Sequence, residues 1–521
     1  MLSMKGKLMF KNIYRFGQNT VKYITLLIVS YLFLGSVLTH IYDSKYIEAY
    51  VKTHNIFYNI LGIVLFCLLF YGLWRLSINR RFPINNKKWK NICLFLICIQ
   101  IIFFMLSNPI PGSDQLNILF AIIDLNGYSS AMPIQDPYWR IAPHVFANVM
   151  YQSVFGIVYT IFYAYNAVLY IIMYELWMRM TKNSKTTAIL FVLAVPITSY
   201  IFMYYGEITA LFGITASIYI IRKFFNGEIR WYHYLVLAGI TFLTYWEKNN
   251  FVIFIIAEIL TIILFTFQYK KKALQSLLIA AVIVVGSISV KPITHELAKN
   301  VFEFDMGEYS SISYIAMGMH EISQNPKYDY NTQIEGGFDG SNHLVVFENN
   351  YDLEKVEMIC REDIKNRLKE FSDNPMTALK FYNNKSLKQW TTPDWSTNWL
   401  IKLSKIENIK KIVEYKEANN TFYTDGLDYE QFKTPVDGFQ DLFSKGMLIC
   451  VYFFACYFIL KNRKENLTPT DCILLALFIG NFIFSLIWEA KPRYCIYGYF
   501  ALMMYVAIHL ARNNKLTIDV L

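Results

Sequence analysis

Twelve apolar runs, each about as long as a membrane-spanning helix, dominate the sequence. They lie near residues 21–41, 56–74, 91–107, 150–178, 187–203, 208–221, 232–245, 251–268, 276–291, 446–460, 471–488 and 496–511. Inside a bilayer the backbone amides and carbonyls find no water, so such a run must form a helix that satisfies them internally. Charged residues make up only 17% of the chain, against about 25% in a typical soluble protein. The sequence therefore predicts an all-α polytopic membrane protein with about twelve transmembrane helices.

Lys and Arg residues gather in alternate loops between these runs. They occupy the ranges 5–15, 80–90, 179–185, 222–223, 270–272, 461–464 and 512–515. Cytoplasmic loops carry the excess of Lys and Arg in membrane proteins, so both termini are predicted to be cytoplasmic. The net charge of +10 then reflects topology and does not indicate a nucleic-acid partner. The abundance of Ile, Lys, Asn, Tyr and Phe is typical of an AT-rich genome and favours a bacterial plasma membrane.

The opposite, external side holds two polar pieces. One is the loop 108–149 within a membrane bundle formed by residues 1–291. The other is the segment 292–445, which is long enough to fold as a mixed extracytoplasmic domain inserted before the last three helices, 446–521. Within it, EKVEMICREDIKNRLKEFSDNP (354–375) has the periodicity of an amphipathic helix and ends at an Asn-Pro pair.

Charged side chains at the external ends of the spans are the candidate functional residues, because charge in or beside a membrane is costly. The carboxylates are Asp114 in PGSDQ, Glu207 in YYGEI, Glu247 in YWEKNN and Glu489 in WEAKPRY. The cations beside them are Lys248, Lys491 and Arg493, and the loop 108–149 adds Asp136, Arg140 and His144. If these groups converge, the cations would hold a lipid-borne phosphate while a carboxylate acts as general base.

Each of these residues also has a structural interpretation. Asp114 follows a Pro-Gly turn and could cap the next helix. Glu207 could lie in a solvent-exposed turn, and Glu247 could pair with the adjacent Lys248. Lys491 and Arg493 could anchor lipid headgroups. His144 could pack within its loop.

Several motifs are missing from the sequence. There is no Walker A motif for ATP-driven transport, no HExxH or paired-cysteine zinc site and no Gly-x-Ser-x-Gly nucleophile elbow. No Asp-x-Asp pair stands in the loop 108–149, which weakens the case for a metal held there. No cofactor is predicted, although a divalent metal stays open.

Short motifs in a fixed order resemble those of the GT-C-fold glycosyltransferases, integral membrane enzymes that use polyprenyl-phosphate sugars. An acidic residue follows a Pro-containing exit from a span in PGSDQ, and YWRIAPH precedes a long apolar helix. EKNNFVIFIIAEIL opens a later span, and IAMGMHEI with GGFDGSNH lies in the polar segment. KSLKQWTTPDW and EAKPRY follow before the last span. The match runs from about residue 91 to the end and implies a GT-C-like fold.

The resemblance implies an inverting transfer of a sugar from a polyprenyl-phosphate donor, such as undecaprenyl phosphate, to a cell-envelope glycan, teichoic acid or lipid-linked acceptor. Asp114 would be the catalytic carboxylate that deprotonates the acceptor hydroxyl, with Glu207 as a second acidic residue. Lys248 and Arg493, with Arg140, would bind the donor phosphate. His144, Glu247, Glu489 and Lys491 are further site candidates.

Other functions remain open at this point. A lipid-linked-oligosaccharide flippase or other transporter would also have about twelve spans, but the charges gather at span ends rather than at mid-membrane. A polysaccharide polymerase that uses diphosphate-linked oligosaccharides would need similar phosphate-binding cations. A non-catalytic subunit of an envelope-assembly complex is a further alternative.

Overall fold

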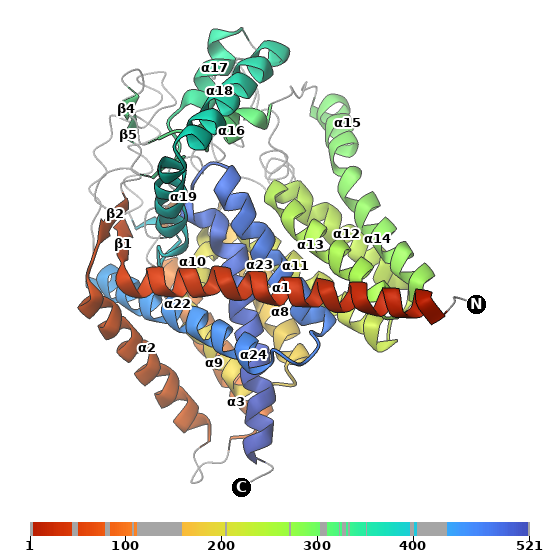
Figure 1. Cartoon of the computed structure of the whole chain (residues 1–521). Helices are drawn as coiled ribbons and strands as arrows, with labels where there is room; N and C mark the ends of the chain where they lie inside the picture. Colours follow the sequence, from red (N-terminus) through yellow and green to blue (C-terminus); the bar gives the residue numbers. More distant parts are fainter. Residues whose placement is uncertain are drawn as a thin grey trace.

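The computed structural model of the chain is helical almost throughout (Figure 1). It describes residues 4–43, 50–78, 84–106, 109–111, 159–203, 206–269, 272–302, 310–321, 324–325, 330–331, 334–350, 352–395, 397, 401–403 and 435–518.

Each of the twelve predicted spans overlaps at least one helix. The helices are α1 (Met4–Leu38), α2 (Ile56–Ser77), α3 (Asn86–Leu106), α8 (Tyr159–Met180), α9 (Lys185–Leu193) with α10 (Val195–Ser199) and η1 (Tyr200–Phe202), α11 (Glu207–Asn226), α12 (Trp231–Glu247), η2 (Asn249–Phe251) with α13 (Val252–Thr266), α14 (Ala273–Ile288), α22 (Pro435–Lys461), α23 (Pro469–Ile487), and η4 (Pro492–Cys495) with α24 (Ile496–Ile518). In the described part of the chain nine helices are long and apolar enough to cross a membrane. A tenth span results if the bent pair Lys185–Leu193 and Val195–Phe202 counts as one. The chain is therefore an all-α polytopic membrane protein, and the count of twelve stays a prediction.

Two predicted spans, 150–178 and 232–245, fall on α8 and α12, which are less suited to lipid. The 17 residues of α12 would extend about 25 Å, less than the roughly 30 Å hydrocarbon core. Helix α8 is rich in tyrosine and carries Glu175 and Arg179 near its end. Helices α8 and α11 pack against each other, so much of the α8 surface faces protein.

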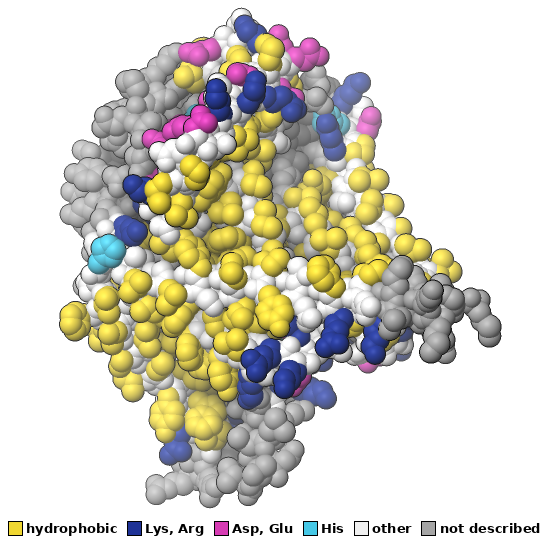
Figure 2. Space-filling model, viewed as in Figure 1, with side chains coloured by type: hydrophobic (Ala, Val, Ile, Leu, Met, Phe, Trp, Pro, Cys, Tyr) yellow, Lys and Arg dark blue, Asp and Glu magenta, His cyan; other side chains and the backbone are white. Residues whose placement is uncertain are grey.

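The apolar helices share one continuous core. Helices α23 and α24 pack together, α13 packs on α23, and α22 packs on both α1 and α2. Helix α1 lies across the front of this bundle in Figure 1, over α22 and α23. Large apolar side chains such as Phe57, Leu61 and Leu68 of α2 point outward, and Figure 2 shows that apolar side chains cover this face of the bundle. Lys and Arg side chains gather below α1 and, together with Asp and Glu, at the top of the molecule (Figure 2). An apolar belt between two charged ends is the surface that a bilayer requires.

The polar segment forms short helices above the bundle (Figure 1). They are α15 (Val290–Phe302), α16 (Ile312–Met317), α17 (Ser341–Glu348), α18 (Leu353–Asp373) and α19 (Pro375–Trp390). The predicted amphipathic helix 354–375 is confirmed as α18, which buries Val356 and ends at Asp373, with Asn374 as its C-terminal cap. Helix α22 begins at Pro435, eleven residues before the predicted span 446–460.

Three small antiparallel strand pairs complete the fold. β1 (His40–Asp43) pairs with β2 (Tyr50–Thr53), with His40 opposite Thr53. β4 (Gln324–Asn325) pairs with β5 (Tyr330–Asn331). β3 (Pro109–Pro111) pairs with β6 (Ile401–Leu403), with Pro109 opposite Leu403. This last pairing places the start of the predicted loop 108–149 beside the chain that follows α19, on the same side of the bundle.

Helices α2 and α22 touch through two glycines, which gives a stability prediction. A methyl group on Gly62 would lie 2.5 Å from the carbonyl oxygen of Leu442 and 3.1 Å from the nitrogen of Gly446. We expect Gly62→Ala to force the helices apart and cost roughly 1–3 kcal/mol, seen as a lower melting temperature in detergent. Gly72→Ala in the same helix is the control, because nothing lies within 4 Å of its added methyl group. Equal melting temperatures for the two variants would contradict this packing.

Candidate functional site

Two of the predicted site residues, Glu207 and Lys248, form a buried ion pair. The Nζ atom of Lys248 donates to Oε1 of Glu207 at 2.7 Å. Glu207 is only 1% exposed and Lys248 only 8%. The interpretation of Glu207 as a solvent-exposed turn residue is therefore wrong.

The local backbone explains this pairing. Glu207 is the first residue of α11, where its carboxylate faces the positive end of the helix dipole. Gly206 precedes it with a φ of 73°, and a side chain there would come within 2.9 Å of the carbonyl oxygen of Glu247. Lys248 follows α12 in extended backbone, with φ −143° and ψ 99°. The glycine thus lets the start of α11 approach the end of α12, and Lys248 reaches across.

Glu247 accepts hydrogen bonds from two neighbouring helices. Tyr165 of α8 donates its hydroxyl to Oε1 of Glu247 at 2.9 Å, and Thr209 of α11 donates to Oε2. Neither Tyr165 nor Thr209 was predicted, because tyrosine and threonine are frequent at span ends and nothing in their spacing marks these two. Glu247 holds α8, α11 and α12 together.

The residues of EAKPRY lie together between α23 and α24. Nζ of Lys491 is 2.8 Å from Oε1 of Glu489, and Tyr494 donates to Oε2 of Glu489 at 3.3 Å. The guanidinium of Arg493 lies 5.2 Å from the centre of the Tyr494 ring and is buried. Glu489 is also buried and Lys491 is partly buried, so the interpretation of Arg493 as a solvated headgroup anchor is wrong, and that of Lys491 stays open.

The two groups of residues meet in one cluster, here called the cation cluster: Glu207, Lys248, Glu489, Lys491 and Arg493. Burial lowers the pKa of Lys248, while the carboxylate of Glu207 raises it. The like charges of Arg493 and Lys491 lower this pKa further. Three cations therefore lie close enough to influence one another in a site largely shielded from water. Lys248 pairs with Glu207 and Lys491 pairs with Glu489, so the cluster holds one positive charge in excess, which suits a bound anion.

The polar segment covers the stretch that carries these residues. Tyr314 stacks on Trp488 with ring centres 5.2 Å apart, and Lys491 lies 5.0 Å from the ring centre of Phe338. A second buried pair, Lys388 with Glu335 at 3.2 Å, lies in the same polar segment. The sequence does not predict this pair. Lys388 lies within the motif KSLKQW, and Glu335 directly precedes the motif GGFDGSNH.

The other predicted site residues lie outside the described part of the chain. They are Asp114, Asp136, Arg140 and His144. Their roles stay predictions. Among the described residues, no group of three or more His, Cys, Asp and Glu side chains could hold a metal ion.

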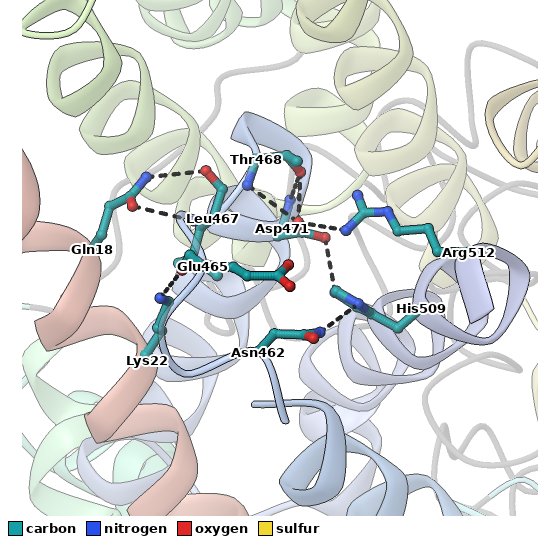
Figure 3. Close-up of polar contacts among 9 residues, drawn as sticks. All are labelled: Gln18, Lys22, Asn462, Glu465, Leu467, Thr468, Asp471, His509 and Arg512. Atoms are coloured by element: carbon teal, nitrogen blue, oxygen red, sulfur yellow. Dashed lines mark hydrogen bonds and ion pairs between the residues drawn. The ribbon is translucent and has the colours of Figure 1, made fainter. Parts of the chain in front are cut away.

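A different polar cluster lies at the opposite end of α23 (Figure 3). Oδ2 of Asp471 accepts from the backbone nitrogen and hydroxyl of Thr468 and from Arg512 at 3.2 Å, and Oδ1 lies 3.4 Å from His509. Lys22 and Gln18 of α1 bind backbone carbonyls of the α22–α23 loop. Both oxygens of Asp471 are engaged by the protein, so this cluster fastens α1, α23 and α24 to one another.

His320 of the polar segment gives a pH prediction. Its Nδ1 lies 2.8 Å from Asp339 and its Nε2 lies 2.8 Å from Asp363, so one ring joins α16, α17 and α18. Burial opposes the charge, but the hydrogen bonds to the two carboxylates outweigh it and raise the pKa of His320 to about 9.

Because the folded pKa lies above the unfolded value of about 6.5, this stabilisation is complete below pH 6.5 and is lost as the pH rises through about 9. We expect the wild type to lose more thermal stability between pH 7 and pH 10 than His320→Gln does. His343→Gln, in the neighbouring helix α17, should keep the wild-type dependence. A His320→Gln variant with the wild-type pH dependence would contradict this assignment.

Comparison with known proteins identifies no relative. No protein-family model, no curated protein and no solved structure matches the chain.

Proposed function

We propose that the chain is an inverting membrane glycosyltransferase that moves a sugar from a polyprenyl-phosphate donor to a cell-envelope acceptor. The observation that carries this proposal is the cation cluster, where the buried Lys248 and Arg493 and the partly buried Lys491 lie together at one end of the apolar bundle. A lipid-borne phosphate has the charge to suit these cations, and its lipid chain suits the apolar belt beside them.

Unpartnered polar atoms in and beside the cation cluster add support. Among the described residues, Oε2 of Glu207 and the hydroxyl of Tyr497 are buried and have no hydrogen-bond partner. Tyr497 is close enough to interact with both Glu207 and Arg493. An unsatisfied buried polar atom costs about 1–3 kcal/mol, which a hydroxylated ligand such as a sugar would offset.

The proposed reaction needs no general acid for the leaving group. The acceptor oxygen attacks the anomeric carbon and gives its proton to Asp114, while the bond from that carbon to the phosphate oxygen breaks. Polyprenyl phosphate leaves with the bonding electrons, and Lys248 and Arg493 stabilise its added negative charge. Attack from the face opposite the leaving group inverts the configuration.

The location of the reaction follows from the same proposal. We place the cation cluster and the polar segment on the external face of a bacterial plasma membrane, with both termini cytoplasmic and about twelve spans. The alternation of basic loops along the sequence supports this orientation.

Turnover by the purified chain tests the proposal. The full-length protein in lipid nanodiscs is given a radiolabelled polyprenyl-phosphate sugar and an envelope-glycan extract. Transfer of label to the glycan, with release of polyprenyl phosphate, is the expected result. Movement of the labelled lipid across a proteoliposome membrane without cleavage of the glycosidic bond would instead identify a flippase. Turnover only with diphosphate-linked oligosaccharides would identify a polymerase.

A further inference from the structure

Lys385 of α19 is a completely buried lysine that has no part in the proposed reaction. Its Nζ donates to the carbonyl oxygen of Gly318 and, at 2.8 Å, to that of Trp488. Both acceptors are backbone atoms, and they belong to parts of the chain 170 positions apart.

The two carbonyls mark the ends of two helices. Gly318 is the C-terminal cap of α16 in the polar segment, and Trp488 is the C-terminal cap of α23 in the membrane bundle. Carbonyls at a helix end lack intrahelical partners and lie at the negative end of the helix dipole. One lysine amine therefore caps a membrane helix and an external helix at the same time.

Two glycines allow the three segments to come this close. A side chain on Gly318 would lie 2.7 Å from backbone atoms of Ile487 and Trp488. Gly336 has a φ of 67°, and a side chain there would collide with the Gly318 carbonyl and lie 2.9 Å from Nζ of Lys385. Only glycine suits the second position, because its conformation and its space both exclude a Cβ atom.

The stretch held in this way carries three of the five residues of the cation cluster. The backbone nitrogen of Ala490 donates to the carbonyl of Gly336 at 2.7 Å, two residues beyond the Lys385 contact. Glu489 and Lys491 flank Ala490, and Arg493 follows in η4. The position of the Trp488 backbone therefore determines the backbone positions of these three charged residues.

The contact of Lys385 with the two carbonyls does not depend on its protonation state. Burial lowers the pKa of Lys385 to about 7, and the carboxylate of Glu489 opposes that shift. Both the ammonium and the neutral amine have at least two N–H groups, so each form can bind the two carbonyls. The contact is therefore kept on both sides of this pKa.

We propose that Lys385 is a positioning residue for donor-phosphate binding, because it joins the ends of α16 and α23 and fixes the backbone from Trp488 to Lys491. This inference rests on the proposed function. Lys385 acts through the cation cluster and does not itself contact the donor.

Hydrogen exchange and lipid binding on the full-length protein in nanodiscs test this role. Lys385→Met keeps the side-chain length but removes the donors. We expect amide exchange across residues 488–491 to become about tenfold faster and polyprenyl phosphate to bind about tenfold more weakly, each equal to roughly 1.4 kcal/mol. With labelled donor, KM should rise by a similar factor and kcat should stay within about threefold.

Two further variants keep the test decisive. Lys380→Met, on the exposed side of the same helix, should match the wild type in every measurement. Lys385→Gln keeps an N–H donor pair without the charge and should give intermediate values, and it replaces Lys385→Met if that protein is not monodisperse.

Three outcomes would overturn the inference. Unchanged exchange in both Lys385 variants would show that the lysine does not hold the stretch. Faster exchange with unchanged phosphate binding would show that the stretch does not position the site. If the wild type does not bind polyprenyl phosphate, the proposed function fails together with the inference. The first two outcomes contradict only the role of Lys385.

Discussion

Lys248→Met is expected to reduce sugar transfer by about 100- to 1,000-fold in kcat/KM, because it removes one of the cations that we propose to stabilise the leaving phosphate. The variant should also be less stable. Its partner Glu207 would remain charged and buried, and removing one member of a buried ion pair costs about 3–5 kcal/mol.

A double variant separates these two effects. Glu207→Gln with Lys248→Met removes both charges, so stability should return towards the wild-type value while polyprenyl-phosphate binding stays weak. Glu207→Gln alone keeps the cation and should still bind polyprenyl phosphate. Melting temperature reports the effect on stability and lipid binding reports the effect on the phosphate site, and both are measured on the same nanodisc samples. Wild-type binding by the double variant would show that Lys248 only neutralises Glu207.

Asp114→Asn is expected to reduce transfer by about 100- to 10,000-fold, which is the usual contribution of a general base. The amide has nearly the same shape but cannot take the acceptor proton. Membrane insertion, melting temperature and polyprenyl-phosphate binding should stay as in the wild type. Asp124→Asn, in the same loop, is the matched control and should keep the wild-type activity.

The same variant can be read out in cells. Mass spectrometry of envelope glycans should show the loss of one sugar in both a deletion strain and an Asp114→Asn strain, which would also identify the product. Normal transfer by Asp114→Asn would remove this residue from the mechanism and leave helix capping as its role.

The membrane helices could be predicted from sequence because their cause is local. A run of about 20 apolar residues has few alternatives to a helix in lipid, and each predicted span overlaps at least one helix. The number of membrane spans was harder to predict, since helices α12 and α8 are stabilised by packing against neighbouring helices as well as by their apolar residues. The break between α9 and α10, with a bend of 59°, follows from Pro196, which lies at the start of α10.

The candidate site was partly predictable for a similar reason. Charges at span ends stand out in an apolar sequence, and five of the predicted residues form the cation cluster. The supporting residues Tyr165 and Thr209 were not identified, and Lys385 entered only as part of the motif KSLKQWTTPDW, because their importance comes from contacts with segments distant in the chain.

The sequence by itself determined that this chain is a multi-helix membrane protein with charged groups at the ends of its spans, because hydrophobicity and charge act on each segment separately. Only the tertiary structure decided which charges meet. Lys248 binds Glu207, 41 positions away, while the adjacent Glu247 accepts from Tyr165 and Thr209. Glu247 is the last helical residue of α12 and Lys248 follows it in extended backbone, so the two side chains reach different elements. The approach of α11 to α12 at Gly206, which no local pattern specifies, brings Glu207 within reach.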